Sequence, residues 1–227
     1  TFHPHPVQVL APHKEHLRLF SLTDQQMQLR QFGLDILFRQ TFTREFSELS
    51  APDFLEQYLL KYFKPKMIAV GYNFTFGSHR HGNIDLLQSF CQRHRIALEV
   101  VPAYRSAVGV VSTSEIRRSL LDGDIDRATE MLARPYCFRG WVKKGEERGR
   151  TIGFPTANLQ VDVNFIPRLG VYACTVEMKG AKLSAVMNIG VNKTFVEGEN
   201  HPIKVEVHIL DFSGDILFSR DELREVI

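Results

Sequence analysis

Apolar and polar positions follow two different patterns in the two halves of the chain. In the first half, helix-like stretches near 23–32, 51–63 and 83–94 alternate with short strand-like runs at 36–39, 67–70 and 97–101. The last two runs are short and apolar, which is typical of strands buried in a parallel sheet. The alternation of helices and strands therefore predicts an α/β domain.

The pattern changes at Arg134-Pro135. Ahead of it, we expect one helix over 115–121 after Ser114, and another that Asp124 caps and that ends near 132. Beyond it, Gly, Asn and Pro separate strand-like runs at 137–142, 170–177, 183–187 and 204–210. The second half is thus predicted to be a small antiparallel barrel with a short helix at 221–226.

The run at 204–210 carries the clearest strand signal. Val205, Val207 and Ile209 alternate with Glu206 and His208. A period of two is the pattern of a strand with one buried face and one open face. Glu206 is therefore expected on the open face.

Two places are shorter than these patterns require. Thr1-Phe2 resembles the tail of a strand without the turn expected before it. Asp215-Ile216 runs directly into Leu217-Phe218, which leaves little room for a strand that would close a barrel. We expect that segments are absent before residue 1 and near 216–217, and an intact mass of 26.1 kDa would contradict this for the second place.

Composition and charge narrow the class of protein. The 227 residues are 44% hydrophobic and 24% charged, with a net charge of +2, so neither an acidic tail nor a strongly basic surface is indicated. Cys91, Cys137 and Cys174 are far apart and form no CxxC pair, which favours a reducing compartment. With no signal peptide and no long apolar run, we expect a cytoplasmic protein that binds neither membrane nor nucleic acid.

The stretch Gly149–Asn158 carries the strongest chemical signal. Its glycines allow backbone N–H groups to approach phosphate oxygens. Thr156 and Asn158 are two residues apart, so on an extended segment both face one side, and their oxygens suit Mg²⁺ held largely by nucleotide phosphates. The alternative is a surface turn whose Thr and Asn bond to their own backbone.

The same stretch resembles the signature of riboflavin kinases, Gly-Arg-x-x-Gly-Phe-Pro-Thr-Ala-Asn. Companion motifs follow the family order: Arg134-Pro135-Tyr136, Gly170-Val171-Tyr172-Ala173, Asn188-Ile189-Gly190 and Val205-Glu206-Val207-His208. The resemblance implies that Thr156 and Asn158 hold the Mg²⁺ nucleotide and that Glu206 is the general base. It also implies ATP-binding positions at Gly149, Arg150, Gly153, Pro155, Thr156, Asn158 and Asn188.

The first half resembles the adenylyltransferase module of bifunctional riboflavin kinase/FAD synthetases. The matching pieces are Thr1–Pro6, Gly71–Gly77 and Ser112–Arg117. A helix start attracts phosphate, and the carboxyl edge of a parallel sheet is where such folds place ligands. The resemblance implies ATP binding by Thr113, Ser114 and Arg117, and flavin binding by Phe2, Asn73 and Phe76. Local alternatives are that the hydroxyls only cap the helix and that Phe76 is a core residue.

Together these resemblances imply a nucleotidyltransferase-like (Rossmann-like) α/β domain at 1–133 and a six-stranded-type riboflavin kinase barrel with a C-terminal helix at 134–227. The implied substrates are ATP, riboflavin and FMN, with Mg²⁺ as cofactor. The family's His-x-Gly-His motif does not occur in these 227 residues. Two alternatives therefore stand beside a two-activity enzyme: a kinase whose first half only binds flavin, and a flavin-binding regulator without turnover.

Overall fold

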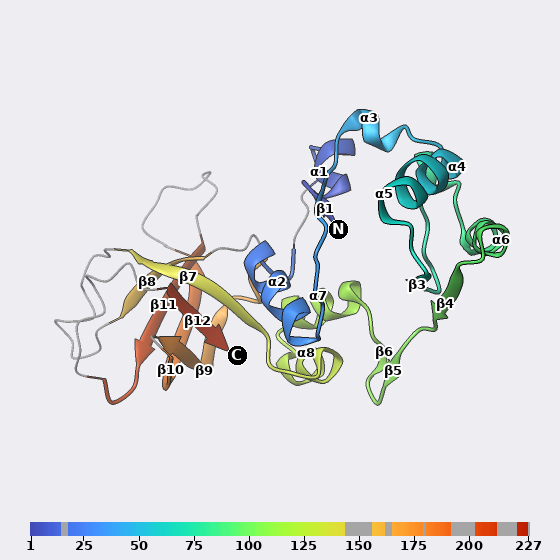
Figure 1. Ribbon diagram of the computed structural model, residues 1–227. Helices are drawn as coiled ribbons and strands as arrows, with labels where there is room; N and C mark the ends of the chain where they lie inside the picture. The colour runs from blue at the N-terminus through green and yellow to red at the C-terminus, as the bar shows by residue number, and fades with distance from the viewer. Residues whose placement is uncertain are drawn as a thin grey trace. The chain divides into compact units, whose positions relative to one another are not determined.

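The computed structural model describes residues 1–14, 18–143, 156–161, 165–178, 180–191 and 203–212, and the backbone of 222–226. It divides into two compact units, one formed by Thr1–His16 with Asp35–Arg105 and one formed by Leu17–Leu34 with Ser106–Ile227 (Figure 1). Neither unit has a boundary at 133/134, the predicted division between the two domains, and that division stays a prediction. Within the described ranges, no helix is both long and apolar enough to cross a membrane.

The first unit contains parallel strand pairs among short helices. Strand β1 (Phe2–His3) pairs with β2 (Gln40–Thr41), and β3 (Met67–Gly71) pairs with β4 (Ala97–Val101), both in parallel. The helical elements are α1 (Pro6–Leu10), α3 (Arg44–Ser47), α4 (Ala51–Asp53), the π-helix η1 (Phe54–Leu60), α5 (Lys61–Phe63), the 3₁₀ turn η2 (Ser78–Arg80) and α6 (Ile84–His94). The core of this unit consists of Ala51, Leu55, Phe76, Leu87, Phe90, Cys91 and Ile96.

These elements confirm an α/β region with parallel strands, but one predicted strand is wrong. Residues 36–39 are not a strand, and the side chains of Ile36 and Phe38 are 81% and 48% exposed. A strand needs a row of backbone partners, and here the ladder with β1 covers only Gln40–Thr41, with one further bond from the Thr1 amino group to the Phe38 carbonyl at 2.7 Å. Apolar composition alone therefore misplaced this strand.

The second unit is built on a closed six-stranded barrel with the order β10-β11-β8-β7-β12-β9 (Figure 1). All neighbouring strands are antiparallel. The strands are β7 (Cys137–Lys143), β8 (Ala157–Val161), β9 (Gly170–Met178), β10 (Ala181–Val191), β11 (Ile203–Ile209) and β12 (Glu222–Val226). The antiparallel barrel is confirmed, and β8 was not predicted from the hydrophobic pattern.

The predicted C-terminal helix at 221–226 is wrong, because Glu222–Val226 forms strand β12. Its backbone pairs with β7 on one side and with β9 on the other. Local helix preference is worth only tenths of a kcal/mol per residue, whereas two open strand edges offer a backbone partner on each side. The expected gap near 216–217 lies outside the described residues.

Three longer helices complete the second unit. They are α2 (Leu22–Gln31), α7 (Thr113–Asp122) and α8 (Ile125–Leu132), while the short strands β5 (Arg105–Ser106) and β6 (Gly109–Val110) lie ahead of α7. Asp124 caps α8 as predicted, since its carboxylate accepts from the N–H of Arg127 at 3.1 Å. Apolar residues of α7 and α8 share one core with the inward side chains of the barrel.

A buried clasp fastens α2 to the first strand of the barrel. Arg139 Nε of β7 donates to Asp24 Oδ1 of α2 at 2.7 Å, and the two side chains are 11% and 2% exposed. Ser21 Oγ, at the helix N-cap, donates to the other carboxylate oxygen at 2.9 Å. Tyr136 Oη donates to the carbonyl of Leu19 at 2.8 Å. This clasp joins segments more than 110 residues apart in the sequence.

Candidate functional site

Three of the residues singled out in the kinase motifs lie in one cross-strand row of the barrel. Glu206 of β11 stands opposite Asn158 of β8 on one side and opposite Asn188 of β10 on the other. Side chains of directly opposed residues share one face of a sheet, with Cβ atoms about 4.5–5.5 Å apart. The fold thus brings together three positions that are 18 to 48 residues apart in the sequence.

This row lies on the outer face of the barrel. The residues before and after each member of the row point inward and are buried, so the row points outward. Glu206 and Asn158 are half-buried and Asn188 is exposed, as a contact surface for ligands requires. The inward neighbours are Ala157, Leu159, Met187, Ile189, Val205 and Val207.

Thr156 directly precedes β8 and is half-buried. It is two residues from Asn158, so continuation of the strand's alternation puts both on one face. The remaining motif residues, Gly149, Arg150, Gly153 and Pro155, lie outside the described residues.

Asn188 lies over a position without a side chain. A Cβ built on Gly190 would be 3.7 Å from Nδ2 and 3.8 Å from Oδ1 of Asn188. The amide therefore leans along β10 over Gly190, which stands opposite Lys204 of β11. A larger residue than glycine would extend into the space beside the amide.

The register extends the row by two residues to which the sequence motifs gave no role in the site. Lys143, the last residue of β7, stands opposite Asn158, and Val171 of β9 stands opposite Asn188. Both are exposed, Val171 by 71%. Lys143 lies outside the quoted motifs, Val171 lies inside one of them, and the pairing of β8 with β7 and of β10 with β9 places both in the row. The complete row runs Val171, Asn188, Glu206, Asn158, Lys143.

The oxygen donors of this row fit a magnesium nucleotide. A hydroxyl, an amide oxygen and a carboxylate come from Thr156, Asn158 and Glu206, and Mg²⁺ prefers such oxygen ligands while taking others from phosphates. In the described part of the chain, no group of three or more His, Cys, Asp or Glu could hold a metal ion by itself. The donor set therefore suits an ion that arrives with its nucleotide.

The second candidate site begins at the N-terminus of α7. Ser112 is the N-cap, and its Oγ accepts from the N–H of Glu115 at 3.2 Å. Thr113 and Ser114 follow in the first turn and are exposed, which confirms their predicted place at a helix start. Arg117 lies about one turn further on and is half-buried. These backbone N–H groups and hydroxyls can bind an anion.

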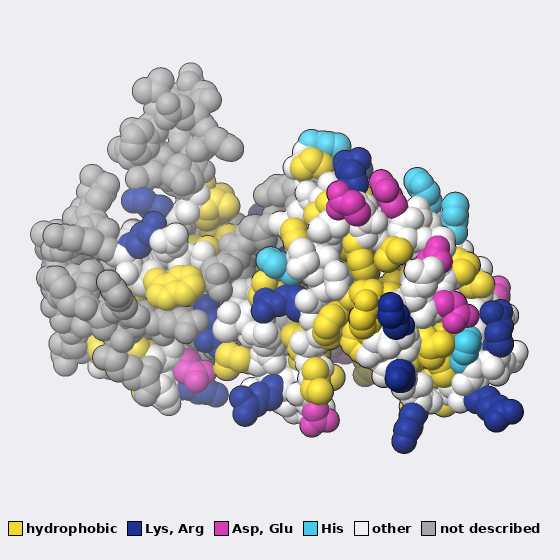
Figure 2. Space-filling view, turned by 45° about the horizontal axis from the view of Figure 1, so that its top comes forward, with side chains coloured by type: hydrophobic (Ala, Val, Ile, Leu, Met, Phe, Trp, Pro, Cys, Tyr) yellow, Lys and Arg dark blue, Asp and Glu magenta, His cyan; other side chains and the backbone are white. Residues whose placement is uncertain are grey.

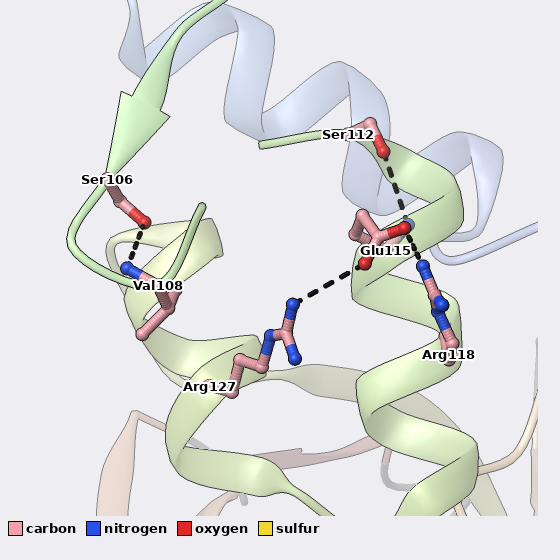
Figure 3. Close-up of polar contacts among 6 residues, drawn as sticks. All are labelled: Ser106, Val108, Ser112, Glu115, Arg118 and Arg127. Atoms are coloured by element: carbon pink, nitrogen blue, oxygen red, sulfur yellow. Dashed lines mark hydrogen bonds and ion pairs between the residues drawn. The ribbon is translucent and has the colours of Figure 1, made fainter. Parts of the chain in front are cut away.

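Glu115 sits between two arginines at this helix start (Figure 3). Its carboxylate pairs with Arg118 of the same helix and, at 3.5 Å, with Nη2 of Arg127 from α8. The second of these pairs links the start of α7 to α8. Because the carboxylate is occupied by these two guanidinium groups, its repulsion of an incoming phosphate is reduced.

The predicted flavin-binding residues belong to the first unit. Asn73 is exposed in the turn that follows β3, at the carboxyl end of the parallel pair. Phe2 is half-buried, and its ring packs edge-on to Phe42 with a centroid distance of 5.2 Å. Phe76 is 7% exposed and stacks on Phe74 in the core of the unit. Only Asn73 offers a largely free side chain, and flavin contacts of all three stay predictions.

Charges of both signs are scattered between hydrophobic side chains on the face of the molecule drawn in Figure 2.

Comparison with protein families assigns both halves of the chain. The family model described as FAD synthetase matches residues 1–115, and the one described as riboflavin kinase matches residues 132–224. The second match contains the row on the barrel, while α2 and the start of α7 fall in the first. The chain thus carries a FAD synthetase domain and a riboflavin kinase domain.

Curated relatives match over nearly the whole chain. The bifunctional riboflavin kinase/FMN adenylyltransferase of Listeria monocytogenes is 34% identical over 99% of this chain and 71% of its own length. Those of Bacillus subtilis and Escherichia coli are also 34% identical, over 95% of this chain and 68% of their own lengths. A solved structure described as a macrolide-efflux protein from Streptococcus pneumoniae is similar with a TM-score of 0.87 and 30% identity, over 100% of this chain and 72% of that one.

Proposed function

This chain belongs to the bifunctional riboflavin kinase/FMN adenylyltransferase family, and on that premise we propose that it makes FMN from riboflavin and Mg-ATP. We propose further that its FAD synthetase domain takes part in joining FMN to AMP from a second ATP, which yields FAD and pyrophosphate. The observation that carries the first proposal is the row in which Glu206 stands between Asn158 and Asn188 on the barrel.

In the kinase reaction, Glu206 is the general base. Its carboxylate accepts the proton of the riboflavin 5′-hydroxyl while that oxygen attacks the terminal phosphorus of ATP. The bond from this phosphorus to the bridging oxygen breaks, and the products are FMN and ADP. A positioned base typically contributes about 10²–10⁴-fold. The half-buried place of Glu206 on a regular strand holds the carboxylate on the outer face where both substrates have access.

Thr156 and Asn158 are the residues that would hold the magnesium nucleotide beside that base. Bound Mg²⁺ supplies neutralisation of the charge that develops on the phosphate oxygens. The protein's own contribution is to orient: Asn158 is fixed in the β8 ladder directly opposite Glu206, so the nucleotide and the hydroxyl meet on adjacent strands. The four motif residues outside the described ranges, Gly149, Arg150, Gly153 and Pro155, and also Asn188, are proposed to complete the ATP site.

For the adenylyl transfer, the α7 start is proposed to bind the ATP phosphates through Thr113, Ser114 and Arg117. The exposed first turn and the paired Glu115 support this assignment. Asn73, after β3, is proposed to contact the flavin, with Phe2 and Phe76 contributing ring contacts from the same unit.

The test is a product assay. The protein is incubated with riboflavin, ATP and Mg²⁺, and riboflavin, FMN and FAD are separated by chromatography. We expect FMN, and FAD where the adenylyl transfer is complete. Formation of FMN alone would restrict the proposal to the kinase. If neither FMN nor FAD formed, the proposal would be refuted.

A substitution of the base sharpens this assay. Glu206→Gln keeps the size of the side chain but removes the proton acceptor, so we expect FMN formation to fall about 10²–10⁴-fold. Riboflavin binding, followed by flavin fluorescence, should change little. Glu130→Gln, on the exposed side of α8, is the matched control and should behave as the parent. Unchanged turnover in Glu206→Gln would remove this residue from its role.

A further inference from the structure

We propose that Lys143 binds the phosphate groups of the nucleotide in the kinase site, as a cationic partner of Asn158. The inference rests on the proposed kinase function and extends it to a residue outside the family motifs. It comes from strand register, which places Lys143 directly opposite Asn158, the predicted nucleotide-binding residue.

The geometry begins with the pairing of β7 and β8. Lys143 is opposite Asn158, one step after Val142 is opposite Leu159. Leu159 is buried in the barrel, so the positions that follow it in register point outward. Lys143 and Asn158 therefore extend from the same outer face, on adjacent strands about 4.8 Å apart.

The reach of the side chain fits a ligand held over β8. Four methylene groups separate the Lys ammonium from its backbone, which lets it cross above one neighbouring strand. Glu206 lies one strand beyond Asn158, about 10 Å from β7. The ammonium group can thus reach a ligand bound at Asn158 without forming an ion pair with the Glu206 carboxylate.

The positive charge of Lys143 is important at this position of the row. A bound nucleoside triphosphate carries several negative charges, and these repel the neighbouring carboxylate of Glu206. A cation on the far side of Asn158 offsets part of this repulsion, because it attracts the phosphates to the β7–β8 side of the row. Among the described residues, Lys204 of β11 is also a lysine near the row, but it stands opposite Gly190, two residues along β11 from Glu206. Of these two lysines, only Lys143 stands opposite Asn158, the residue proposed to bind the nucleotide.

The row then has a direction across the barrel. It begins at the exposed apolar Val171, passes the base in the middle and ends at the cation. An anionic nucleotide fits the Lys143 end, and the less polar flavin substrate fits the Val171 end. Transfer of a phosphoryl group between the two requires them to meet above Glu206, which stands between these ends.

The experiment compares Lys143→Gln with Lys143→Arg and with the control Lys182→Gln. Lys182 is an exposed lysine of β10, six residues from Asn188 and so about 20 Å along the strand. We expect Lys143→Gln to raise the KM for Mg-ATP about 10-fold while leaving the KM for riboflavin within about twofold. Lys143→Arg should retain most of the affinity, and Lys182→Gln should equal the parent.

Direct binding separates this proposal from the proposed function. Titration calorimetry with Mg-ADP needs no turnover, so it tests Lys143 even if the parent formed no FMN in the product assay. We expect Lys143→Gln to weaken Mg-ADP binding, with a loss that shrinks as salt rises, because added ions screen the contact. A Kd within about twofold of the Lys182→Gln control at low salt would overturn the proposal.

Discussion

Removing one partner of the buried clasp is the most demanding test of how the second unit holds together. Asp24→Ala leaves the Arg139 guanidinium, which is 11% exposed, without its carboxylate. It also leaves Ser21 Oγ without the acceptor that it meets at 2.9 Å. An uncompensated buried charge typically costs about 3–5 kcal/mol, whereas an exposed ion pair is worth about 0–1 kcal/mol. We therefore expect Asp24→Ala to lower the free energy of unfolding by about 3 kcal/mol or more.

The assay follows from a feature of the same strand. Trp141 is the only tryptophan of the chain and lies two residues after Arg139 in β7. Its fluorescence therefore reports on unfolding of the unit that contains the clasp. Urea is the suitable denaturant because it adds no ions that would screen the pair. The midpoint should fall while the slope with denaturant stays unchanged.

A double substitution distinguishes a lost charge pair from lost packing. Asp24→Leu combined with Arg139→Met replaces the buried ions with apolar groups, which is often neutral or stabilising. We expect the double variant to regain most of the stability that each single change removes. Arg127→Ala, which breaks the partly exposed pair with Glu115, should cost about 1 kcal/mol or less. A loss in Asp24→Ala no larger than in Arg127→Ala would refute the argument.

Two further predictions concern single positions. Burial raises the pKa of the Tyr136 phenol, so the folded state keeps its proton and stability is lost as pH rises past about 10, the ordinary value for tyrosine in the unfolded chain. Tyr136→Phe should lower the free energy of unfolding by about 1 kcal/mol at neutral pH. Urea titrations at a series of pH values should show a smaller alkaline loss of stability in this variant, and the same dependence on pH as in the parent would contradict this. A Cβ at Gly77, which has a φ of +71°, would lie 2.5 Å from Cα of Ala51, whereas one at Gly33, with a φ of +81°, would meet nothing within 4 Å. Gly77→Ala should therefore lower the Tm far more than Gly33→Ala, which carries only the backbone cost of about 1–2 kcal/mol, and equal losses would refute the steric reasoning.

Local signals placed the starts of two helices correctly. Asn83 and Asp124 were expected at helix starts, and both accept a hydrogen bond from the first turn of their helices. Capping depends on a few neighbouring residues, which the sequence shows directly. The strand at 97–101 was also placed correctly, because a short apolar run between polar segments is distinctive.

Long-range partners account for the failures. Ile36, Leu37 and Phe38 are apolar, yet 36–39 belong to no strand in the described structure, while 222–226 form a strand despite a helix-like sequence. In both cases, the outcome depends on backbone partners that are distant in the chain. The Asp24–Arg139 clasp is of the same kind, since neither side chain belongs to a recognisable motif.

For the candidate site, the motif resemblance identified Asn158 and Glu206 but could not show that they stand opposite each other. That adjacency depends on the pairing of β8 with β11, and a shift of one residue would turn one of them to the other face. Lys143 was found only through the pairing of β7 with β8. Phe76 illustrates the limit of the resemblance, because its side chain is a member of the core as well as a predicted flavin contact.

The clasp has a consequence for how the protein folds as it is synthesised. Leu19 leaves the ribosome 117 residues before its partner Tyr136, and Asp24 leaves 115 residues before Arg139. At about 5–20 residues per second, this interval lasts roughly 6–23 s. During that time Asp24 and the carbonyl of Leu19 lack the partners that they have in the folded unit. Folding from the N-terminus onward cannot complete this unit, so chaperone contacts are expected to concentrate on nascent chains in which Arg139 has not yet been synthesised.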